Sequence, residues 1–175
     1  LGAFPNRTAT FLLHFCIHSG ILATLLPLPP IADVQAFLHN LNLCLNSANP
    51  DITLMNRPGS AEIQDLLALE ISTFDKCIPY LKALQDVHFS HYQSGLPHEA
   101  AAGRHLWVFG VLVGKPPKPG RTTKKPQRAA YVKIQFGYEP LQAICISFHR
   151  PKRPLSFPFS PTYQLEFDTI YHAKP

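Results

Sequence analysis

The sequence predicts an α+β fold in which N-terminal helices pack on a small antiparallel sheet. Apolar residues recur at helical spacing in the first half of the chain, whereas β-rich runs dominate the second half. The chain also has 18 prolines among 175 residues, and only 15% of its residues are charged. Because proline fixes φ and removes a hydrogen-bond donor, this content argues against a long helical bundle. The length is sufficient for one domain with a hydrophobic core.

The N-terminal segment 10–28 is almost uncharged and strongly apolar. The alternatives for it are a signal peptide or membrane segment, a buried helix, and extraneous upstream sequence. His14 and His18 interrupt the apolar run, and Pro27 ends it. We therefore divide the chain into an apolar and helical N-terminal segment, an α+β domain with a basic sheet, and a C-terminal tail or edge strand. These three parts cover residues 1–54, 55–160 and 161–175.

Two helices are expected before the sheet. Segment 33–45 carries apolar residues at helical spacing behind Asp33, which can cap the start of the helix. A second helix is expected to begin at Ser60, although its capping box lacks the reciprocal glutamate. Pro79 is expected at the start of a further turn or at a kink. Segment 81–92 is then expected to be a helix, or a helix that runs into a strand.

Three strands follow. Segment 106–113 is a continuous apolar run, segment 130–136 alternates, and segment 142–148 is again rich in β-branched residues. A short turn at 137–141 joins the last two, so we expect an antiparallel meander. Segment 164–171 is the candidate edge strand.

The four cysteines show no zinc-binding pattern. Cys16, Cys44, Cys77 and Cys145 are widely spaced, and no two of them form a C-x-x-C pair. We expect buried, unbridged thiols, with two disulfides as the alternative. No metal or other cofactor is predicted.

Positive charge is concentrated in the second half of the chain. Residues 1–99 have a net charge of −4, whereas residues 100–165 hold eleven Lys and Arg against one acid, Glu139, for a net of +10. The basic residues are interleaved with aromatic ones, which favours binding to nucleic acid. The residues expected to contact phosphates are Lys115, Lys118, Arg121, Lys124, Lys125, Arg128, Lys133, Arg150, Lys152 and Arg153.

Two pairs of polar residues on the expected strands suit RNA cleavage. Tyr131 and Lys133 are two apart and share one face of the sheet, as do Ser147 and His149. Cleavage without a metal needs a group that accepts the 2′-hydroxyl proton, positive charge at the pentavalent phosphate, and a proton for the 5′-oxygen. Histidine can move the proton, and lysine or arginine can stabilise the phosphate. The alternative is that Tyr131 and His149 are ordinary half-buried strand residues.

Four short motifs, in order along the chain, resemble those of the MqsR family of toxin ribonucleases, which belongs with the RelE-type toxins. Leu69–Lys76 resembles L-x-x-S-x-F-x-K, and Gln85–Val87 resembles the start of Q-D-V-Y. Tyr131–Ile134 resembles Y-L-K-I, and Ile146–Phe148 followed by His149 resembles V-S-F-K with histidine in place of lysine.

The resemblance implies a metal-independent, mRNA-cleaving enzyme of the cytoplasm, neutralised by an antitoxin protein. Its active-site residues would be Lys76, Gln85, Tyr131 and His149. The segment between Gln85 and Tyr131 is far longer than in the family. Two other functions remain open: a non-catalytic nucleic-acid-binding module, and a secreted or membrane-anchored interaction protein.

Overall fold

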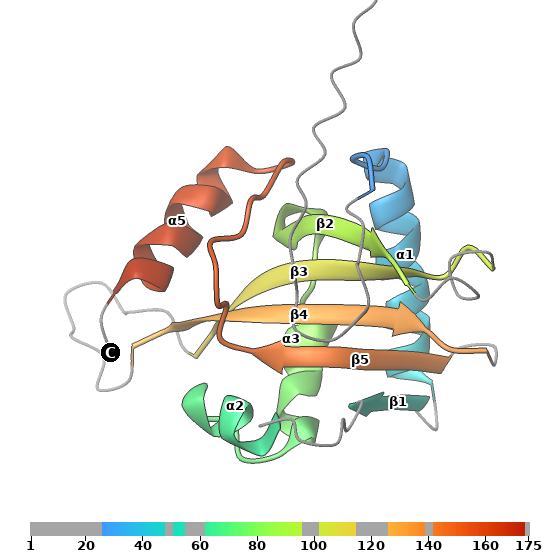
Figure 1. Cartoon of the computed structure of the whole chain (residues 1–175). Coiled ribbons are helices and arrows are strands. Elements are labelled where there is room, and N and C mark those ends of the chain that lie inside the picture. The colour runs from blue at the N-terminus through green and yellow to red at the C-terminus, as the bar shows by residue number, and fades with distance from the viewer. Residues whose placement is uncertain are drawn as a thin grey trace, which may run out of the picture.

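A computed structural model describes residues 26–47, 51–54, 62–95, 102–114, 126–138 and 142–173. These residues form a five-stranded sheet with helices on both of its faces (Figure 1). The strands are ordered β1-β5-β4-β3-β2 across the sheet. Their bounds are β1 Asp51–Leu54, β2 Phe89–Ser94, β3 His105–Val113, β4 Arg128–Phe136 and β5 Gln142–His149.

Helices both precede and follow the strands of the sheet. The helical elements are α1 Ile31–Asn46, α2 Glu62–Ala68, the 3-10 turn η1 Phe74–Cys77, α3 Ile78–Lys82, the 3-10 turn η2 Asp86–His88, and α5 Pro161–His172. The α+β class is therefore confirmed. The expectation of a small sheet behind N-terminal helices is wrong, because the sheet has five strands and α5 follows all of them.

The predicted edge strand at 164–171 is instead part of α5. Ser160 caps this helix, since its Oγ accepts a hydrogen bond from the Tyr163 backbone N–H at 3.2 Å, and Pro161 occupies the first turn. Serine at the N-cap followed by proline is a common way to start a helix. Phe167 is fully buried beneath the helix. The helix was missed because its aromatic and β-branched residues also suit a strand.

The short strand β1 was also missed, and it makes the sheet mixed. It runs parallel to β5, with register from Asp51 opposite Gln142 to Leu54 opposite Cys145. Four residues are too few to show a reliable period in the sequence. By contrast, β3, β4 and β5 form the antiparallel meander that was expected.

The first helix and the strand at the end of segment 81–92 agree with the sequence pattern. In α1 the residues at helical spacing are buried, including Val34, Phe37 and Leu41. Pro79 lies in the first turn of the short helix α3, and the chain enters β2 at Phe89. The expected helix over 81–92 is much shorter than predicted: α3 ends at Lys82, the 3-10 turn η2 follows, and only the strand at the end of the segment agrees with the prediction.

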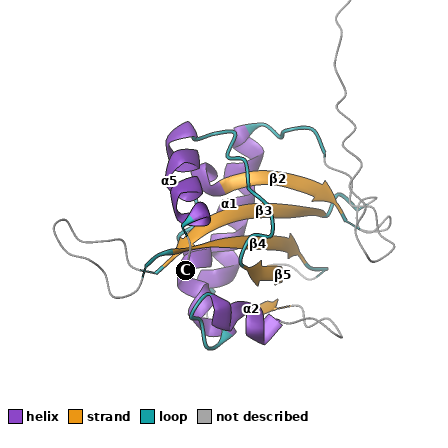
Figure 2. Cartoon of the chain, turned by 60° about the vertical axis from the view of Figure 1, so that its left-hand side comes forward, coloured by secondary structure: helices purple, strands orange, loops and turns teal. Residues whose placement is uncertain are grey.

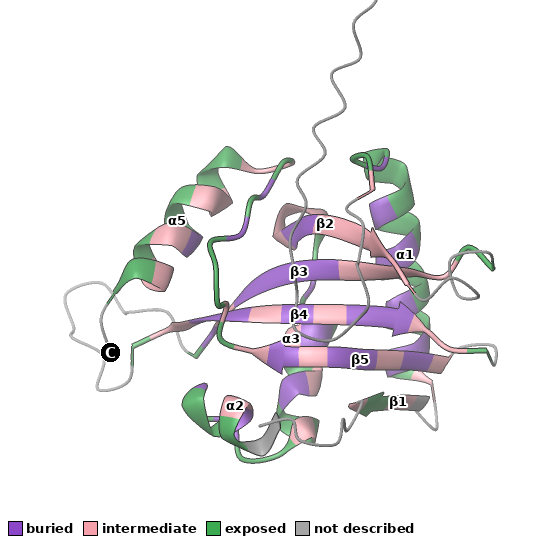
Figure 3. Ribbon diagram, viewed as in Figure 1, coloured by how far each residue is buried: buried purple, intermediate pink, exposed green. Residues whose placement is uncertain are grey.

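Residues of the strands belong to two different hydrophobic clusters. Figure 3 shows buried residues along much of β3, β4 and β5. One face, the α1/α3 face, packs against those helices and includes Val132 and Ile134. The other face, the α5 face, packs against α5 and includes Val108, Ala129 and Phe167. Figure 2 shows α1 and α5 separated by the sheet. The period of two along β4 thus assigns each of its side chains to one face.

The segment after β5 returns across β3 at a glycine. A Cβ at Gly110 would lie 2.6 Å from Phe157 Cζ and 2.9 Å from Leu155 Cδ1, so no larger residue fits without movement. Tyr163 of α5 donates its hydroxyl hydrogen to the Gly110 carbonyl at 3.1 Å. Gly110 is paired with Tyr131 on β4, so this crossing lies beside the predicted catalytic tyrosine.

Three of the cysteines fit the expectation of buried thiols. Cys44, Cys77 and Cys145 are buried and form no disulfide, whereas Cys16 lies outside the described residues. Burial raises the pKa of the Cys77 thiol to about 12, with a smaller contribution from the Asp75 charge.

No helix among the described residues is long and apolar enough to cross a membrane. Most of the apolar segment 10–28 lies outside the described residues, so its role as a signal or membrane segment stays a prediction. The division at residues 54 and 160 also stays a prediction. The structure shows that α1 shares its core with the sheet.

Candidate nucleic-acid interface

Tyr131 and His149 lie directly opposite each other on β4 and β5. Their rings stack with centroids 4.8 Å apart and planes 14° apart, and both residues are half-buried. The Nζ of Lys133 is 5.7 Å from the centre of the Tyr131 ring, near the outer limit of a cation–π contact. Three of the residues proposed to act on RNA are therefore together on the α5 face.

A polar row runs across this face at the level of Lys133. Lys133 is opposite Ser147 on β5 and opposite Val108 on β3, which is in turn opposite His91 on β2. A bulge in β5 at Ile146 shifts the register after this point. Ser147 and His149 share the face of Tyr131.

The hydrogen bond of His149 determines its tautomer. The Nδ1 atom is 2.7 Å from the Arg150 carbonyl oxygen, which can only accept, so Nδ1 carries the hydrogen. The lone pair of the neutral ring is therefore on Nε2. Burial lowers the pKa of His149 below 6.5, against the opposing effects of the Arg150 hydrogen bond and the Asp65 charge. A neutral imidazole with its lone pair on Nε2 can accept a proton at neutral pH.

His91 is a second half-buried histidine of this face, and it was not among the site residues predicted from the sequence. Its Nδ1 is 3.0 Å from Ser90 Oγ, and its Nε2 is 3.0 Å from Gln93 Nε2. Burial, and secondarily the Lys133 charge, lower its pKa to about 4. Segment 89–94 shows no alternation of apolar and polar residues, because a bulge between Phe89 and His91 shifts the register. The sequence signal for His91 is therefore weak, and segment 81–92 is compatible both with a helix and with a helix that runs into a strand.

The structure does not place Lys76 and Gln85 beside Tyr131 and His149. Lys76 is exposed, and its Nζ donates to Ser72 Oγ at 2.7 Å on the turn that leads into α3. That helix packs on the α1/α3 face, whereas Tyr131 packs against the cluster of the α5 face. Figure 1 shows α3 behind the strands. Gln85 is exposed before β2, where its backbone N–H donates to His88 Nδ1 at 2.9 Å. Both residues have local structural contacts instead.

Apart from Lys133, the predicted phosphate-binding residues divide into three groups. Five of them, Lys115, Lys118, Arg121, Lys124 and Lys125, lie outside the described residues. Arg128 is paired with Glu70, its Nη2 lying 2.7 Å from Glu70 Oε1. Beyond Lys133, the remaining cations follow directly after His149 and are exposed. These are Arg150, Lys152 and Arg153.

Two acidic residues near this site were also missed. The Asp65 charge of α2 raises the pKa of His149, although burial has the larger effect. Glu70 follows the same helix and holds Arg128. Both lie more than 50 residues before β4 in the chain, so no local pattern could associate them with the strands.

Comparison with known proteins finds no family model, no curated protein and no solved structure that matches this chain. The likeness to the MqsR family therefore consists of the four short motifs alone. Two of the four residues it assigns to the active site, Tyr131 and His149, are in contact in this structure.

Proposed function

We propose that the α5 face binds RNA and cleaves it without a metal. The observation that carries this proposal is the stacked pair of Tyr131 and His149 beside Lys133, with the Nε2 lone pair of His149 available to accept a proton. A proton acceptor, a hydroxyl donor and a cation are the groups that the reaction needs.

In the proposed reaction, His149 Nε2 removes the proton of a ribose 2′-hydroxyl. The 2′-oxygen attacks the adjacent phosphorus and forms a P–O bond, while the bond to the 5′-oxygen breaks. Lys133 stabilises the additional negative charge on the phosphate oxygens. The leaving 5′-oxygen takes a proton from the Tyr131 hydroxyl, and the imidazolium returns the first proton to the tyrosinate through solvent. The products are a 2′,3′-cyclic phosphate and a 5′-hydroxyl end.

The proposal departs from the residue set that the family resemblance implies. Lys76 and Gln85 have their own contacts away from the stacked pair, and Lys133 supplies the cation instead. The toxin role and an antitoxin partner rest on the short motifs alone.

The test is cleavage of single-stranded RNA by the purified chain in the presence of EDTA. We expect His149→Ala and Tyr131→Phe each to lower the cleavage rate by about a hundredfold or more, the usual size of a lost acid–base group. Lys76→Ala is the matched control and is expected to leave the rate unchanged.

Two results would reject the proposal. One is intact RNA across a range of sequences and pH values. The other is cleavage that persists in His149→Ala at the wild-type rate. Loss of activity in Lys76→Ala with an unchanged fold would instead support the family's residue set.

A non-catalytic nucleic-acid-binding module is the second candidate. Its support is the run of exposed cations that follows β5, since Arg150 and Lys152 can hold phosphates whether or not a bond breaks. RNA that binds in a salt-dependent way and stays intact would favour this candidate over the enzyme.

A further inference from the structure

A pocket of about 260 Å³ lies where β4 begins and β5 ends. Arg150, which directly follows His149, forms part of its lining, together with Arg128 and Glu70. Ile170 and Tyr171 of α5 form an apolar side. The volume is a little below the usual range for small-molecule sites, which begins at about 300 Å³. A single phosphate group with part of its sugar is a ligand of suitable size.

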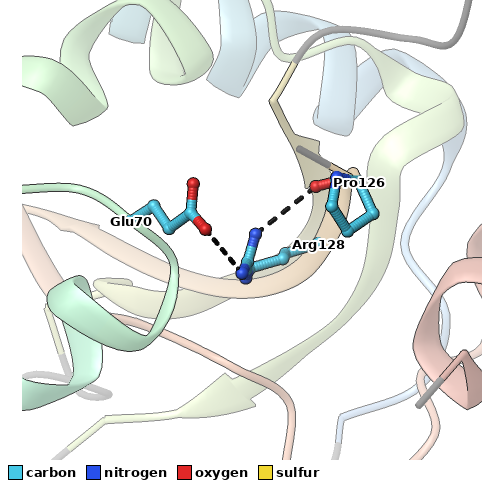
Figure 4. Close-up of polar contacts among 3 residues, drawn as sticks. All are labelled: Glu70, Pro126 and Arg128. Carbon is cyan, nitrogen blue, oxygen red and sulfur yellow. Dashed lines mark hydrogen bonds and ion pairs between the residues drawn. The ribbon is translucent and has the colours of Figure 1, made fainter. Parts of the chain in front are cut away.

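The guanidinium of Arg128 is held in place from two sides (Figure 4). Its Nη2 donates to Glu70 Oε1 at 2.7 Å, and its Nη1 donates to the Pro126 carbonyl at 3.4 Å. Arginine has five N–H donors, so donors remain for a ligand after these two bonds. A planar guanidinium that is already oriented loses less entropy when it binds a phosphate.

Glu70 reaches Arg128 from an unfavourable backbone conformation. Its φ is +59°, the one positive φ of a non-glycine residue in the described part of the chain. The backbone bonds from Ile71 N–H to the Leu66 carbonyl and from Glu70 N–H to the Leu67 carbonyl form a Schellman motif after α2. Glycine is the usual residue at this position. A carboxylate here is more consistent with a functional role than with helix termination alone.

We propose that this pocket binds a phosphate group through Arg128 and Arg150. The inference rests on the proposed RNA-binding function and extends it: the phosphate is that of a nucleotide next to the one cleaved at His149. With Glu70 included, the pocket retains a net charge of +1, which suits the single charge of a phosphodiester. Glu70 positions Arg128 and is not itself a ligand.

The test uses a short 2′-O-methyl RNA, which binds but has no 2′-hydroxyl to react. We expect Arg150→Gln to weaken its binding roughly tenfold or more, the usual effect of losing a hydrogen bond to a charged group. The slope of log K against log salt should also fall by about 0.7, the value for one phosphate contact on a single strand. Arg128→Gln should weaken binding in the same way, and thermal unfolding checks that each variant is folded.

Lys82→Gln is the matched control, because Lys82 is an exposed cation of α3 on the opposite side of the sheet. It removes the same charge and should change neither affinity nor slope. Equal effects of Arg150→Gln and Lys82→Gln would overturn the proposal. Strands with and without a 5′-terminal phosphate distinguish a terminal phosphate from an internal one as the ligand.

The outcomes separate this inference from the proposed function. Arg150-dependent binding of the methylated strand without cleavage of ordinary RNA would retain the pocket and reject the enzyme. If the protein cleaves ordinary RNA and Arg150→Gln binds the methylated strand as tightly as the wild type does, the enzyme is retained and the pocket is rejected. If the protein binds no RNA, NMR titration with inorganic phosphate tests the pocket directly, and an absence of Arg150-dependent shifts rejects it.

Discussion

At the scale of single residues, the two half-buried histidines of the α5 face, His91 and His149, differ in what they can do. Among the described residues, none forms a hydrogen bond with Nε2 of His149, whereas both ring nitrogens of His91 have neighbours at 3.0 Å. Lys133 contributes to lowering the pKa of both, after burial, so one cation influences two titrating groups. We assign proton transfer to His149 and a structural role to His91.

The lowered pKa of His91 predicts that the protein loses stability on mild acidification. Its pKa is about 4 in the folded chain against 6.5 in the reference state, so between these values the unfolded chain binds more protons. The free energy of unfolding should therefore rise with pH from about 4 to 6.5, by up to about 3 kcal/mol from this group. Urea unfolding at several pH values measures the effect.

His91→Gln should reduce this slope, because the uncharged amide does not titrate. His39→Gln is the control, since His39 is exposed on α1. An unchanged slope in His91→Gln would show that another group causes the acid sensitivity. His88 and His149 also have lowered pKa values and would account for what remains of the slope.

The proposed RNA cleavage should depend on pH through His149. The base must be neutral, and burial lowers its pKa below 6.5. The rate should therefore fall on acidification with a midpoint below pH 6.5. A rate that rises steeply above pH 7 would argue against His149 as the base.

At the scale of elements, the turn after α2 has two roles. It ends the helix, and its residue Glu70 holds Arg128 in place. The buried side chains of Leu66 and Ile71 lie at the two positions of the Schellman motif that usually make a hydrophobic contact. Glu70 lies between them with positive φ. The left-handed backbone at Glu70 lowers the free energy of unfolding, whereas its ion pair with Arg128 raises it. The two contributions can be measured separately.

Glu70→Gly and Glu70→Ala separate these two terms. Both remove the ion pair with Arg128, but only glycine relieves the left-handed backbone. We expect Glu70→Gly to be more stable than Glu70→Ala by about 1 to 2 kcal/mol. Urea unfolding of the two variants gives this difference directly, and equal stabilities would show that the turn carries no strain.

At the scale of the whole molecule, the sheet separates two hydrophobic clusters. Trp107 stacks on Phe37 on the α1/α3 face, with ring centroids 4.7 Å apart, while Phe167 fills the α5 face. β3 and β4 supply residues to both clusters. The two faces should therefore unfold together in one cooperative transition.

Phe167→Ala tests this coupling. Removing a fully buried phenylalanine should cost about 3 to 5 kcal/mol, whereas Leu165→Ala on the exposed side of the same helix should cost under about 0.5 kcal/mol. In Phe167→Ala, Trp107 fluorescence and far-UV circular dichroism should shift by the same amount. A Trp107 transition that stays at its wild-type position would show that α5 unfolds independently.

Local sequence patterns were enough to predict the α+β class, helix α1, the β3–β4–β5 meander, and the shared faces of Tyr131 with Lys133 and of Ser147 with His149. These features follow from periods of 3.6 and 2, which a short window of the chain contains. No such window predicts that β1 pairs with β5, that α5 covers one face, or that Glu70 meets Arg128. The position of Lys76 on the other side of the sheet is equally hidden from local patterns. These contacts join segments that are far apart in the chain. Which segments meet is determined by tertiary packing, and a short window of sequence does not contain that information.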